Sequence, residues 1–407
     1  MGNGRSRLES ALAEGGGEEG TSQQMRFFGL VNLGNTCYCN SVMQALYSCN
    51  AFRKAVLRWY AQQPSSRHED LLLCLGELFA SIERSSRRTG RLAPSRFVER
   101  VRSDNELFSS RSAHQDAHEF LNFLLNALDD SLERELSQSS SDVSPEPAKC
   151  SLSSSSSSPS QHKKGSSNTS TESQGTSSAP SHNFVKSLFQ GKLVSRTRCL
   201  WCENVTVREE SYLDLSLDVE RNSSLSSCLR NFSRQELLAG SEKFHCDTCC
   251  GLQEAQRRML IKHAPPVLAL HLKRFKFFEN GRYRKVTQRV AFPQELKLCN
   301  ITEDSNAKDV PYDLFAVVVH KGRTLNFGHY ISLVRGANGC WVRFDDDEVD
   351  LEDEFAPESV FGAPQEDEPE AASDVANGYI LLYSQRSALD WDESGECLKS
   401  NGRVGVG

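Results

Sequence analysis

Residues 29–46 of this chain read GLVNLGNTCYCNSVMQAL and place a cysteine, Cys37, where a polar Gly/Asn loop meets an apolar segment. Apolar residues recur after Cys37 at helical spacing, which predicts a helix that starts close to it, and Asn35 and Thr36 are both suitable N-cap residues. A cysteine at a helix N-terminus faces the positive end of the helix dipole, which favours the nucleophilic thiolate. Asn32, in the same loop, is a suitable hydrogen-bond donor to an oxyanion. The stretch therefore predicts a site that attacks carbonyl groups.

A small buried residue without chemistry is the alternative interpretation for any cysteine in an apolar segment. We assign that role to Cys39, Cys49 and Cys74. The long and distinctive sequence around Cys37 favours the nucleophile instead, provided that a histidine and an acid elsewhere in the chain can serve it.

Composition limits the class of protein. The 407 residues suffice for one large core or two moderate ones. The net charge of −7 argues against general nucleic-acid binding and suits a partner with basic contact surfaces. With 14 cysteines and no signal peptide, we expect reduced thiols in the cytoplasm or the nucleus rather than a secreted disulfide framework. No window approaches the length of apolar sequence that a membrane-spanning helix needs.

The first six residues, MGNGRS, match the M-G-x-x-x-[ST] pattern for N-myristoylation at Gly2. Short motifs also match by chance, and a single myristoyl chain anchors a protein only marginally. We therefore expect at most weak membrane association, and only if Gly2 is acylated.

The chain divides into segments of different composition. Residues 1–25 and the polar tail 385–407 are expected to be flexible. Residues 27–136 show mostly helical periodicity. Residues 137–182 are rich in serine and poor in large apolar residues, so we expect a disordered insertion there. A passive insertion and a tether tuned by phosphorylation are both consistent with that composition.

From Asn183 onward the pattern is largely that of strands. The predicted strands include residues 267–277, 312–320, 330–334, 340–344 and 379–383. The predicted architecture is α+β, with a helical lobe that carries Cys37 packed on a mostly antiparallel sheet.

A cysteine nucleophile needs an imidazole that takes its proton and later protonates the leaving amine. Of ten histidines, His329 opens a strand in the run FGHYISLVRGANGCWVRFDDDEV, which reads as a hairpin. Counting back from a loop centred on residues 336–339 places His329 opposite roughly Asp346, with Asp345 one residue away. A carboxylate there fixes the imidazole tautomer and stabilises the imidazolium. A solvated acidic loop is the alternative for residues 345–347, and the pairing with His329 favours the catalytic interpretation.

Two Cys-x-x-Cys pairs, Cys199 with Cys202 and Cys246 with Cys249, are well separated in the sequence. Four thiolates in a reducing compartment are typical of a closed, structural zinc site. The long separation requires two hairpins that bring the pairs together. Redox-active pairs are the alternative, but neither pair opens a helix within a βαβ unit.

These motifs resemble those of the ubiquitin-specific proteases, which are papain-like deubiquitinases. GNTCYCNSV is similar to the Cys box of that family, and GHYIS with WVRFDDDEV is similar to its His box. LALHLKRFKF and NGYILLYS also look like family signatures, so the resemblance covers about residues 27–384. It implies one catalytic domain, 26–384, with a papain-like fold. Its parts are a helical thumb (about 26–192), zinc-ribbon fingers (about 193–264) and an antiparallel palm sheet (about 265–384).

The resemblance implies a thiol protease that hydrolyses the isopeptide bond between the C-terminal glycine of ubiquitin and a substrate lysine through a thioester. Carried over onto this sequence, it makes Cys37 the nucleophile, His329 the base and Asp345 the third member of the triad. Asn32 corresponds to the side chain that holds the oxyanion. Asp346 is expected to help position the base or polarise the site.

Residues 113–121, AHQDAHEFL, resemble the Gln-Asp box of the family. In that box the carboxylate that matches Asp116 contacts the C-terminal tail of ubiquitin. His114 stands where a second glutamine is common, which leaves the role of that position open.

The resemblance also implies a cofactor and partners. Zinc would have a structural role in the fingers, bound by Cys199, Cys202, Cys246 and Cys249. The compact length and the SRTRCLWC context resemble a subgroup activated by a WD-repeat propeller that docks on the fingers. The expected partners are ubiquitin, ubiquitinated proteins and such an activator, with no nucleic acid.

Two other classes of protein remain as alternatives. A catalytically weak ubiquitin-binding scaffold that requires a partner for activity would usually lack the cysteine, the histidine or the acid, and all three are present. A zinc-ribbon nucleic-acid binder is opposed by the negative charge and by the lack of a clustered basic and aromatic stripe.

Overall fold

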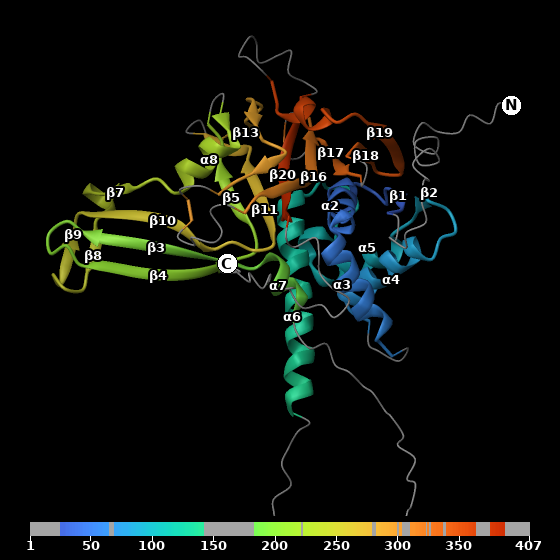
Figure 1. Ribbon diagram of the computed structural model, residues 1–407, viewed down its shortest axis with the longest axis horizontal. Coiled ribbons are helices and arrows are strands. Elements are labelled where there is room, and N and C mark those ends of the chain that lie inside the picture. The colour runs from blue at the N-terminus through green and yellow to red at the C-terminus, as the bar shows by residue number, and fades with distance from the viewer. Residues whose placement is uncertain are drawn as a thin grey trace, which may run out of the picture.

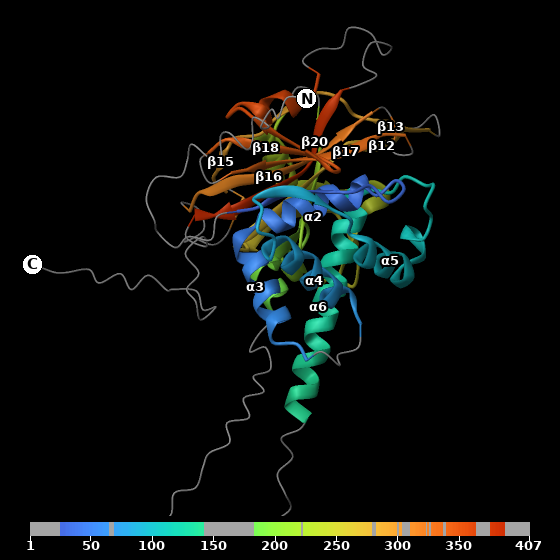
Figure 2. The same cartoon turned by 90° about the vertical axis from the view of Figure 1, so that its right-hand side faces the viewer.

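The computed structural model describes residues 25–386 except 65–68, 142–182, 221–222, 279–281, 299–300, 303–309, 323, 325–326, 337–338 and 364–374. Gly2, most of the Ser-rich segment and most of the polar tail lie outside the described residues, so the predictions made for them stay predictions. The described chain forms a helical lobe, a large sheet and a narrow sheet that projects to one side (Figures 1 and 2). Within it, no helix is long and apolar enough to cross a membrane.

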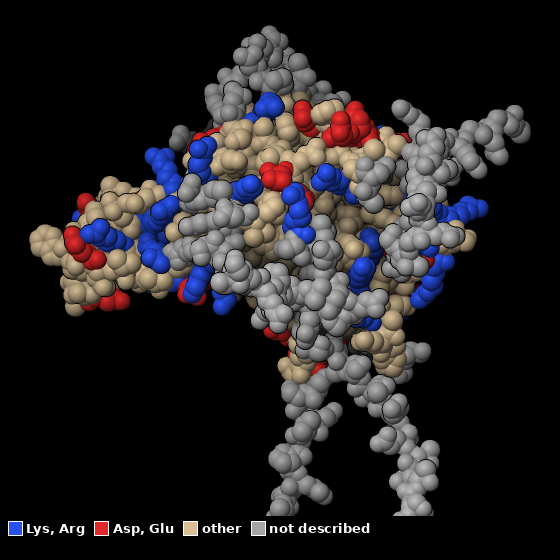
Figure 3. Space-filling model, viewed as in Figure 1, with Lys and Arg blue, Asp and Glu red and all other residues tan. Residues whose placement is uncertain are grey.

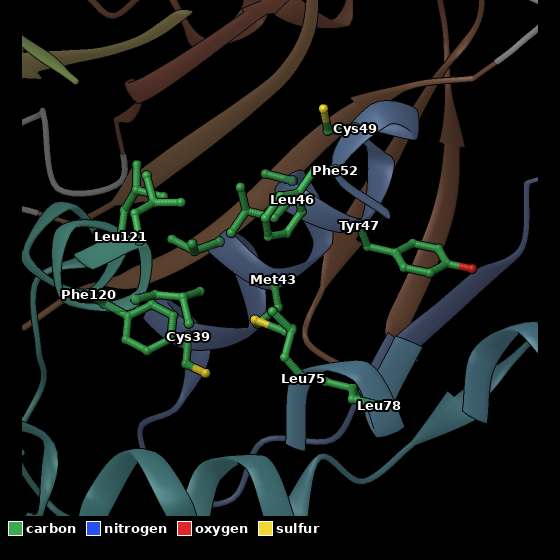
Figure 4. Close-up of a cluster of buried hydrophobic side chains, with 14 of the residues drawn as sticks. Cys39, Met43, Leu46, Tyr47, Cys49, Phe52, Leu75, Leu78, Phe120 and Leu121 are labelled. Atoms are coloured by element: carbon green, nitrogen blue, oxygen red, sulfur yellow. The ribbon is translucent and has the colours of Figure 1, made fainter. Parts of the chain in front are cut away.

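The helical lobe surrounds the helix that begins at Cys37. Its described helices are α2 (Cys37–Ser48), α3 (Asn50–Ala61), α4 (Leu71–Glu83), α5 (Ser95–Asp104), α6 (Ala117–Ser141) and α7 (Phe184–Phe189). Eleven of the 12 residues of α2 are buried, so this helix forms the centre of the lobe. In Figure 4, Met43 and Leu46 of α2 lie in one apolar cluster with Leu75 of α4 and Phe120 of α6. The mostly helical pattern predicted for residues 27–136 is therefore confirmed, and α4 and α6 are among its helices.

Helix α6 ends later than the composition predicted. It continues through Ser141, whereas the disordered insertion was expected to begin at residue 137. The buried apolar stripe nucleates the helix, and each further residue then adds a hydrogen bond at little cost. The Ser137 hydroxyl also donates to the Glu133 carbonyl one turn earlier, at 2.8 Å.

The large sheet has the strand order β19-β18-β17-β16-β20-β11-β5, and β15 pairs with β16. Its strands are β5 (Leu215–Asp218), β11 (Val267–Lys273), β15 (Glu295–Leu296), β16 (Tyr312–Lys321), β17 (His329–Arg335), β18 (Trp341–Asp345), β19 (Glu348–Glu352) and β20 (Ala376–Gln385). Every pairing is antiparallel except that of β11 with β5. The predicted α+β class with a mostly antiparallel sheet is confirmed.

Alternation along the central strands divides the apolar residues between two cores, because successive side chains point to opposite faces. In β16, Ala316 and Val318 belong to the core shared with the helical lobe. Val317 and Val319 belong to a second core on the far face. That face is covered by smaller elements, which are α8 (Leu225–Phe232), β6 (Ser223–Ser224), β14 (Val290–Ala291) and the short helical segment Ala356–Val360. Both faces of the sheet are thus covered.

The single strand predicted over residues 267–277 is wrong. The chain leaves the sheet at Arg274 and continues as β12 (Phe275–Phe278), which pairs with β13 (Arg282–Lys285). The Arg274 side chain is fully buried. Its guanidinium donates to four backbone carbonyls, which are those of Gly378 (2.8 Å), Val286 (3.0 Å), Gln288 (2.9 Å) and Phe361 (3.2 Å). The strand ends here because the charged side chain turns inward and binds carbonyls from several separate segments of the chain.

The narrow sheet has the order β4-β3-β10-β7 and is called the finger sheet below. Its strands are β3 (Gly191–Cys199), β4 (Val205–Tyr212), β7 (Glu236–Leu238) and β10 (Ala255–His263), with a small hairpin of β8 (Phe244–Cys246) and β9 (Gly251–Gln253) at the far end. Figure 3 shows many Lys and Arg side chains along this sheet and a cluster of Asp and Glu over β19. The negative net charge is therefore unevenly distributed.

Arg274→Met is expected to lower the free energy of unfolding by about 3 kcal/mol, because it removes the donor that four backbone carbonyls share. Urea denaturation measures the change. Lys273→Met is the matched control, since the Lys273 side chain is 43% exposed and pairs with the exposed Asp218 carboxylate at 3.2 Å. Equal stability of the two variants would contradict this account of Arg274.

Candidate active site and metal centre

Cys37 is the first residue of α2, as predicted. Thr36 takes the N-cap position but makes no capping hydrogen bond. Its hydroxyl instead accepts from the Leu33 amide at 2.9 Å, and the Asn35 side chain donates to the Ser112 carbonyl at 2.7 Å. The predicted side-chain cap is therefore absent. The first amide N–H groups of α2 form the positive end of the helix dipole, which is the end where Cys37 lies.

His329 is the first residue of β17, and α2 packs directly on this strand. Nε2 of His329 lies 2.6 Å from Oδ1 of Asp345, which leaves Nδ1 for the sulfur. A hydrogen bond with Cys37 raises the pKa of His329 to about 9, and the Asp345 carboxylate contributes in the same direction against the effect of burial. The structure thus places the predicted nucleophile, base and acid together.

Asp345, rather than Asp346, is the carboxylate that holds the imidazole. Strand β18 ends at Asp345, and Asp346 adopts a left-handed turn conformation with φ of 52°. The turn directs the two neighbouring carboxylates to different partners. Burial acts to raise the pKa of Asp345, but the hydrogen bond and charge of His329 and the charge of Lys321 together lower it below its ordinary value.

Asp346 joins three separate segments of the chain. Its Oδ2 accepts from the Asn32 side chain at 2.8 Å, and its Oδ1 accepts from the Asn40 side chain at 2.8 Å. Its backbone carbonyl accepts from the Leu30 amide at 2.8 Å. The geometry therefore associates Asp346 with the loop before Cys37, while Asp345 holds the imidazole.

The Asn32 side chain is fixed at both ends. Its Oδ1 accepts from the amides of Gly34 at 3.0 Å and Thr36 at 3.2 Å, and its Nδ2 donates to Asp346. An amide nitrogen carries two hydrogens, so the bond to Asp346 leaves one for an oxyanion. Fixed donors of this kind need no reorganisation during a reaction.

Two positioning residues were not predicted from the motifs. Asn40 is buried and donates to the Leu30 carbonyl at 3.1 Å as well as to Asp346. Gln44, four residues later, donates to the Phe28 carbonyl at 2.6 Å. Two polar residues spaced by four on the buried side of an apolar helix are a signal that could have found them, because buried amides require partners.

Gly29 permits the close approach of β1 (Phe27–Leu30) to the turn that carries the acids. A Cβ atom at this position would clash with the backbone of Asp347. β1 pairs in parallel with β2 (Thr89–Leu92), so the turn rests against a strand that is itself held in place.

Asp116 lies at the start of α6 and is buried. Its Oδ1 accepts from the amides of His118 at 2.7 Å and Glu119 at 3.2 Å, which caps the helix. Its Oδ2 accepts from the Tyr379 hydroxyl of β20 at 2.5 Å. The structure thus gives Asp116 a role in joining α6 to the sheet, and its contact with a substrate tail stays a prediction.

The four predicted ligand cysteines meet at the end of the finger sheet, where β3 and β8 terminate. All four sulfur atoms lie within 4.8 Å of one another, with Cys199 to Cys249 at 3.9 Å and Cys202 to Cys246 at 3.6 Å. These separations exceed a disulfide bond of about 2.05 Å. They match the spacing of about 3.8 Å between sulfurs around a tetrahedral ion with metal–sulfur bonds of about 2.3 Å. The cluster therefore fits one metal ion.

The His329 imidazole is expected to titrate near pH 9, which NMR of the ring protons measures. Because the pKa of His329 in the folded state lies above the unfolded value of about 6.5, its protonation stabilises the fold fully below pH 6.5. This stabilisation is lost as the pH rises through 9. Asp345→Asn should lower the midpoint because the imidazolium loses its charged acceptor. Asp347→Asn is the control, since that carboxylate pairs with Arg91 at 3.0 Å. A shared midpoint in both variants would contradict the assignment.

Comparisons with known proteins indicate the family of this chain. A family model described as ubiquitin carboxyl-terminal hydrolase matches residues 28–383. Ubiquitin carboxyl-terminal hydrolase 4 of Arabidopsis thaliana is 47% identical over 94% of this chain and 98% of its own length. Ubiquitin carboxyl-terminal hydrolase 12 of Salmo salar is 42% identical over 93% of this chain and 94% of its own.

Among solved structures, a SAGA DUB module of Ubp8, Sgf11, Sus1 and Sgf73 bound to monoubiquitin matches with a TM-score of 0.63. The match covers 93% of this chain and 74% of that chain at 22% identity, so it bears on the fold alone. The family model and the two relatives span nearly the whole described fold, including the Cys37 and His329 segments. This chain therefore belongs to the ubiquitin carboxyl-terminal hydrolase family, in agreement with the resemblance to the ubiquitin-specific proteases.

Proposed function

We propose that this chain is a deubiquitinating thiol protease that cleaves the isopeptide bond between the C-terminal glycine of ubiquitin and a substrate lysine. One observation carries the proposal: the His329 imidazole is hydrogen-bonded to Asp345 and lies beside Cys37, which is the first residue of a buried helix. The names of the two relatives support ubiquitin as the conjugated protein.

In the proposed reaction, the Cys37 thiolate attacks the carbonyl carbon of the terminal glycine while His329 holds the proton. The oxyanion receives hydrogen bonds from Asn32 and from the first amide of α2. His329 then protonates the departing lysine amine, the carbon–nitrogen bond breaks, and a thioester to Cys37 remains. His329 next removes a proton from water, which attacks the thioester and releases the glycine carboxylate and the thiolate.

The two neighbouring carboxylates serve different steps in this scheme. Asp345 keeps the imidazole in the orientation and tautomer that the proton transfers need. Asp346 acts on the other side of the carbonyl, because it holds Asn32 where the oxyanion develops. Loss of either carboxylate would therefore slow the reaction for a different reason.

Asp116 is proposed to contact the arginine-containing tail of ubiquitin, as the Gln-Asp box implies. Each carboxylate oxygen has two lone pairs, so the bonds that cap α6 and receive the Tyr379 hydroxyl still allow a further donor. Glu119 adds a second acid nearby, and burial together with the charge of Asp116 raises its pKa. A basic tail would relieve that repulsion.

Cys199, Cys202, Cys246 and Cys249 are proposed to bind zinc. Four thiolates around one ion leave no open position, so the metal would stabilise the finger sheet and take no part in bond cleavage. The spacing of the sulfurs supports this choice over a redox pair.

Partners and location rest on the resemblance. We propose that a WD-repeat protein docks on the finger sheet and raises activity, and that the enzyme acts in the cytoplasm, the nucleus or both. Weak membrane association is proposed only for a chain acylated at Gly2. A ubiquitin-binding scaffold that needs its partner for activity is the alternative, and the first experiment below distinguishes it.

Cys37→Ala is expected to abolish adduct formation with a ubiquitin probe that carries a C-terminal electrophile, because the nucleophile is removed. The wild-type chain should form a stable adduct, which a mass increase of one ubiquitin detects. Cys39→Ala is the matched control, since Cys39 lies on the same helix and is buried. A folded wild-type chain without an adduct would contradict the proposal and support the scaffold.

The purified chain is expected to contain one zinc ion per molecule, which atomic emission measures. Cys246→Ser should lower the zinc content and the thermal midpoint, because a structural zinc site contributes directly to folding. Cys250→Ser is the control, since the Cys250 thiol is exposed and lies beside the cluster. Equal zinc content in both variants would exclude this site.

A further inference from the structure

Lys285 is the last residue of β13, and its half-buried side chain reaches the backbone at the end of β16. Its Nζ donates to the backbone carbonyls of His320 at 2.9 Å, Gly322 at 2.8 Å and Val375 at 3.3 Å. An ammonium group has three N–H donors, so the three carbonyls match it in number. A neutral side chain of the same length offers fewer donors to these positions.

The three carbonyls surround one residue, Lys321. His320 and Gly322 are its neighbours in the sequence. Val375 directly precedes Ala376, which pairs with Lys321 across β16 and β20. The Lys285 ammonium therefore fixes the backbone at the end of β16 from both sides of Lys321.

Lys321 in turn contacts the base and its acid. It is the register partner of His329 across β16 and β17. Its own Nζ lies 3.4 Å from Oδ2 of Asp345. A shift of the Lys321 backbone would thus displace both members of the His329–Asp345 pair.

The segment that leads into His329 rests on the same backbone. Gly322 has φ of 112°, and a Cβ atom there would press on the backbone of Phe327 and Gly328. A Cβ atom at Gly328 would clash with the buried His320 ring. The residues just before His329 are therefore closely packed against the backbone that the Lys285 ammonium holds.

Lys285 is kept in this place at an energetic cost. Burial lowers its pKa to about 7, and the charge of Arg274 acts in the same direction. Burial and the charge of Lys285 together lower the pKa of His320 to about 3. Titratable groups with perturbed pKa values cluster at functional sites, and the three carbonyls that Lys285 contacts surround the residue paired with His329.

We propose that Lys285 is a positioning residue for catalysis: its three hydrogen bonds hold the end of β16, and thereby hold His329 at the distance from Cys37 that proton transfer needs. This inference rests on the proposed function, which supplies the reaction that His329 serves. The placement of His329 beside Cys37 can be tested without ubiquitin.

The experiment compares the full wild-type chain with Lys285→Met at a temperature where both are folded. Hydrolysis of a fluorogenic C-terminal amide of ubiquitin should show kcat reduced about tenfold with KM changed less than about twofold, because a misplaced base slows chemistry and leaves binding intact. Alkylation of Cys37 by iodoacetamide at pH 7, followed by peptide mass analysis, should slow in parallel. Lys276→Met is the control. Lys276 lies on the same hairpin, and its Nζ donates to the Val219 carbonyl at 2.8 Å.

A lowered thermal midpoint with unchanged kcat and unchanged Cys37 alkylation in Lys285→Met would overturn the proposal and leave Lys285 a structural role. If the wild-type chain proves inactive on ubiquitin, the alkylation rates still decide the matter, so the two proposals fail separately. If Lys285→Met does not fold, Lys285→Gln replaces it. The glutamine side chain keeps two N–H donors, so kcat should fall by less than the tenfold expected for Lys285→Met. A wild-type kcat would again overturn the proposal.

Discussion

The packing of α2 on β17 is the contact on which the site depends. It joins the first residue of a helix near the N-terminus to the first residue of a strand almost 300 positions later, and so brings Cys37 to His329. The helix can occupy this central place because nearly all of its residues are buried, and its two buried amides find backbone partners in β1. A polar helix could not be buried there, and an apolar helix without Asn40 and Gln44 would lose two hydrogen bonds to β1.

The turn after β18 divides two adjacent carboxylates between two tasks. Asp345 still belongs to the strand and faces the imidazole, while Asp346 has already turned into the left-handed region and faces Asn32 and Asn40. Because the carbonyl of Asp346 also binds β1, the loop before Cys37 and the strand after His329 are held as one unit. The same turn thus positions both the oxyanion donor, Asn32, and the base, His329.

Two cationic side chains, one buried and one half-buried, perform a similar task elsewhere in the fold. Arg274 and Lys285 each donate to carbonyls of several chain segments at once, and both contact the start of β20, at Gly378 and Val375. Each fixes the position of several irregular backbone segments, at the cost of desolvating a charge. The finger sheet follows a different principle, since its far end relies on four thiolates that fit a metal ion rather than on an apolar core.

The sequence by itself determined the features that depend on local pattern. Helical spacing after Cys37, alternation in the palm strands, the hairpin around His329 and the two Cys-x-x-Cys pairs all follow from neighbours within a few residues, where periodicity and turn chemistry act. These features were enough for the α+β class and the family, and they supplied the residues proposed for the site.

Tertiary structure decided what depends on side-chain direction and on partners distant in the sequence. A one-residue change of register turns a side chain to the other face of a sheet, so spacing alone left Asp345 and Asp346 interchangeable until the left-handed turn separated them. The break of the predicted strand at Arg274 and the three carbonyls around Lys285 were likewise outside the reach of pattern. Their partners come from segments 12 to 104 residues away, and only the folded chain brings those segments to one place.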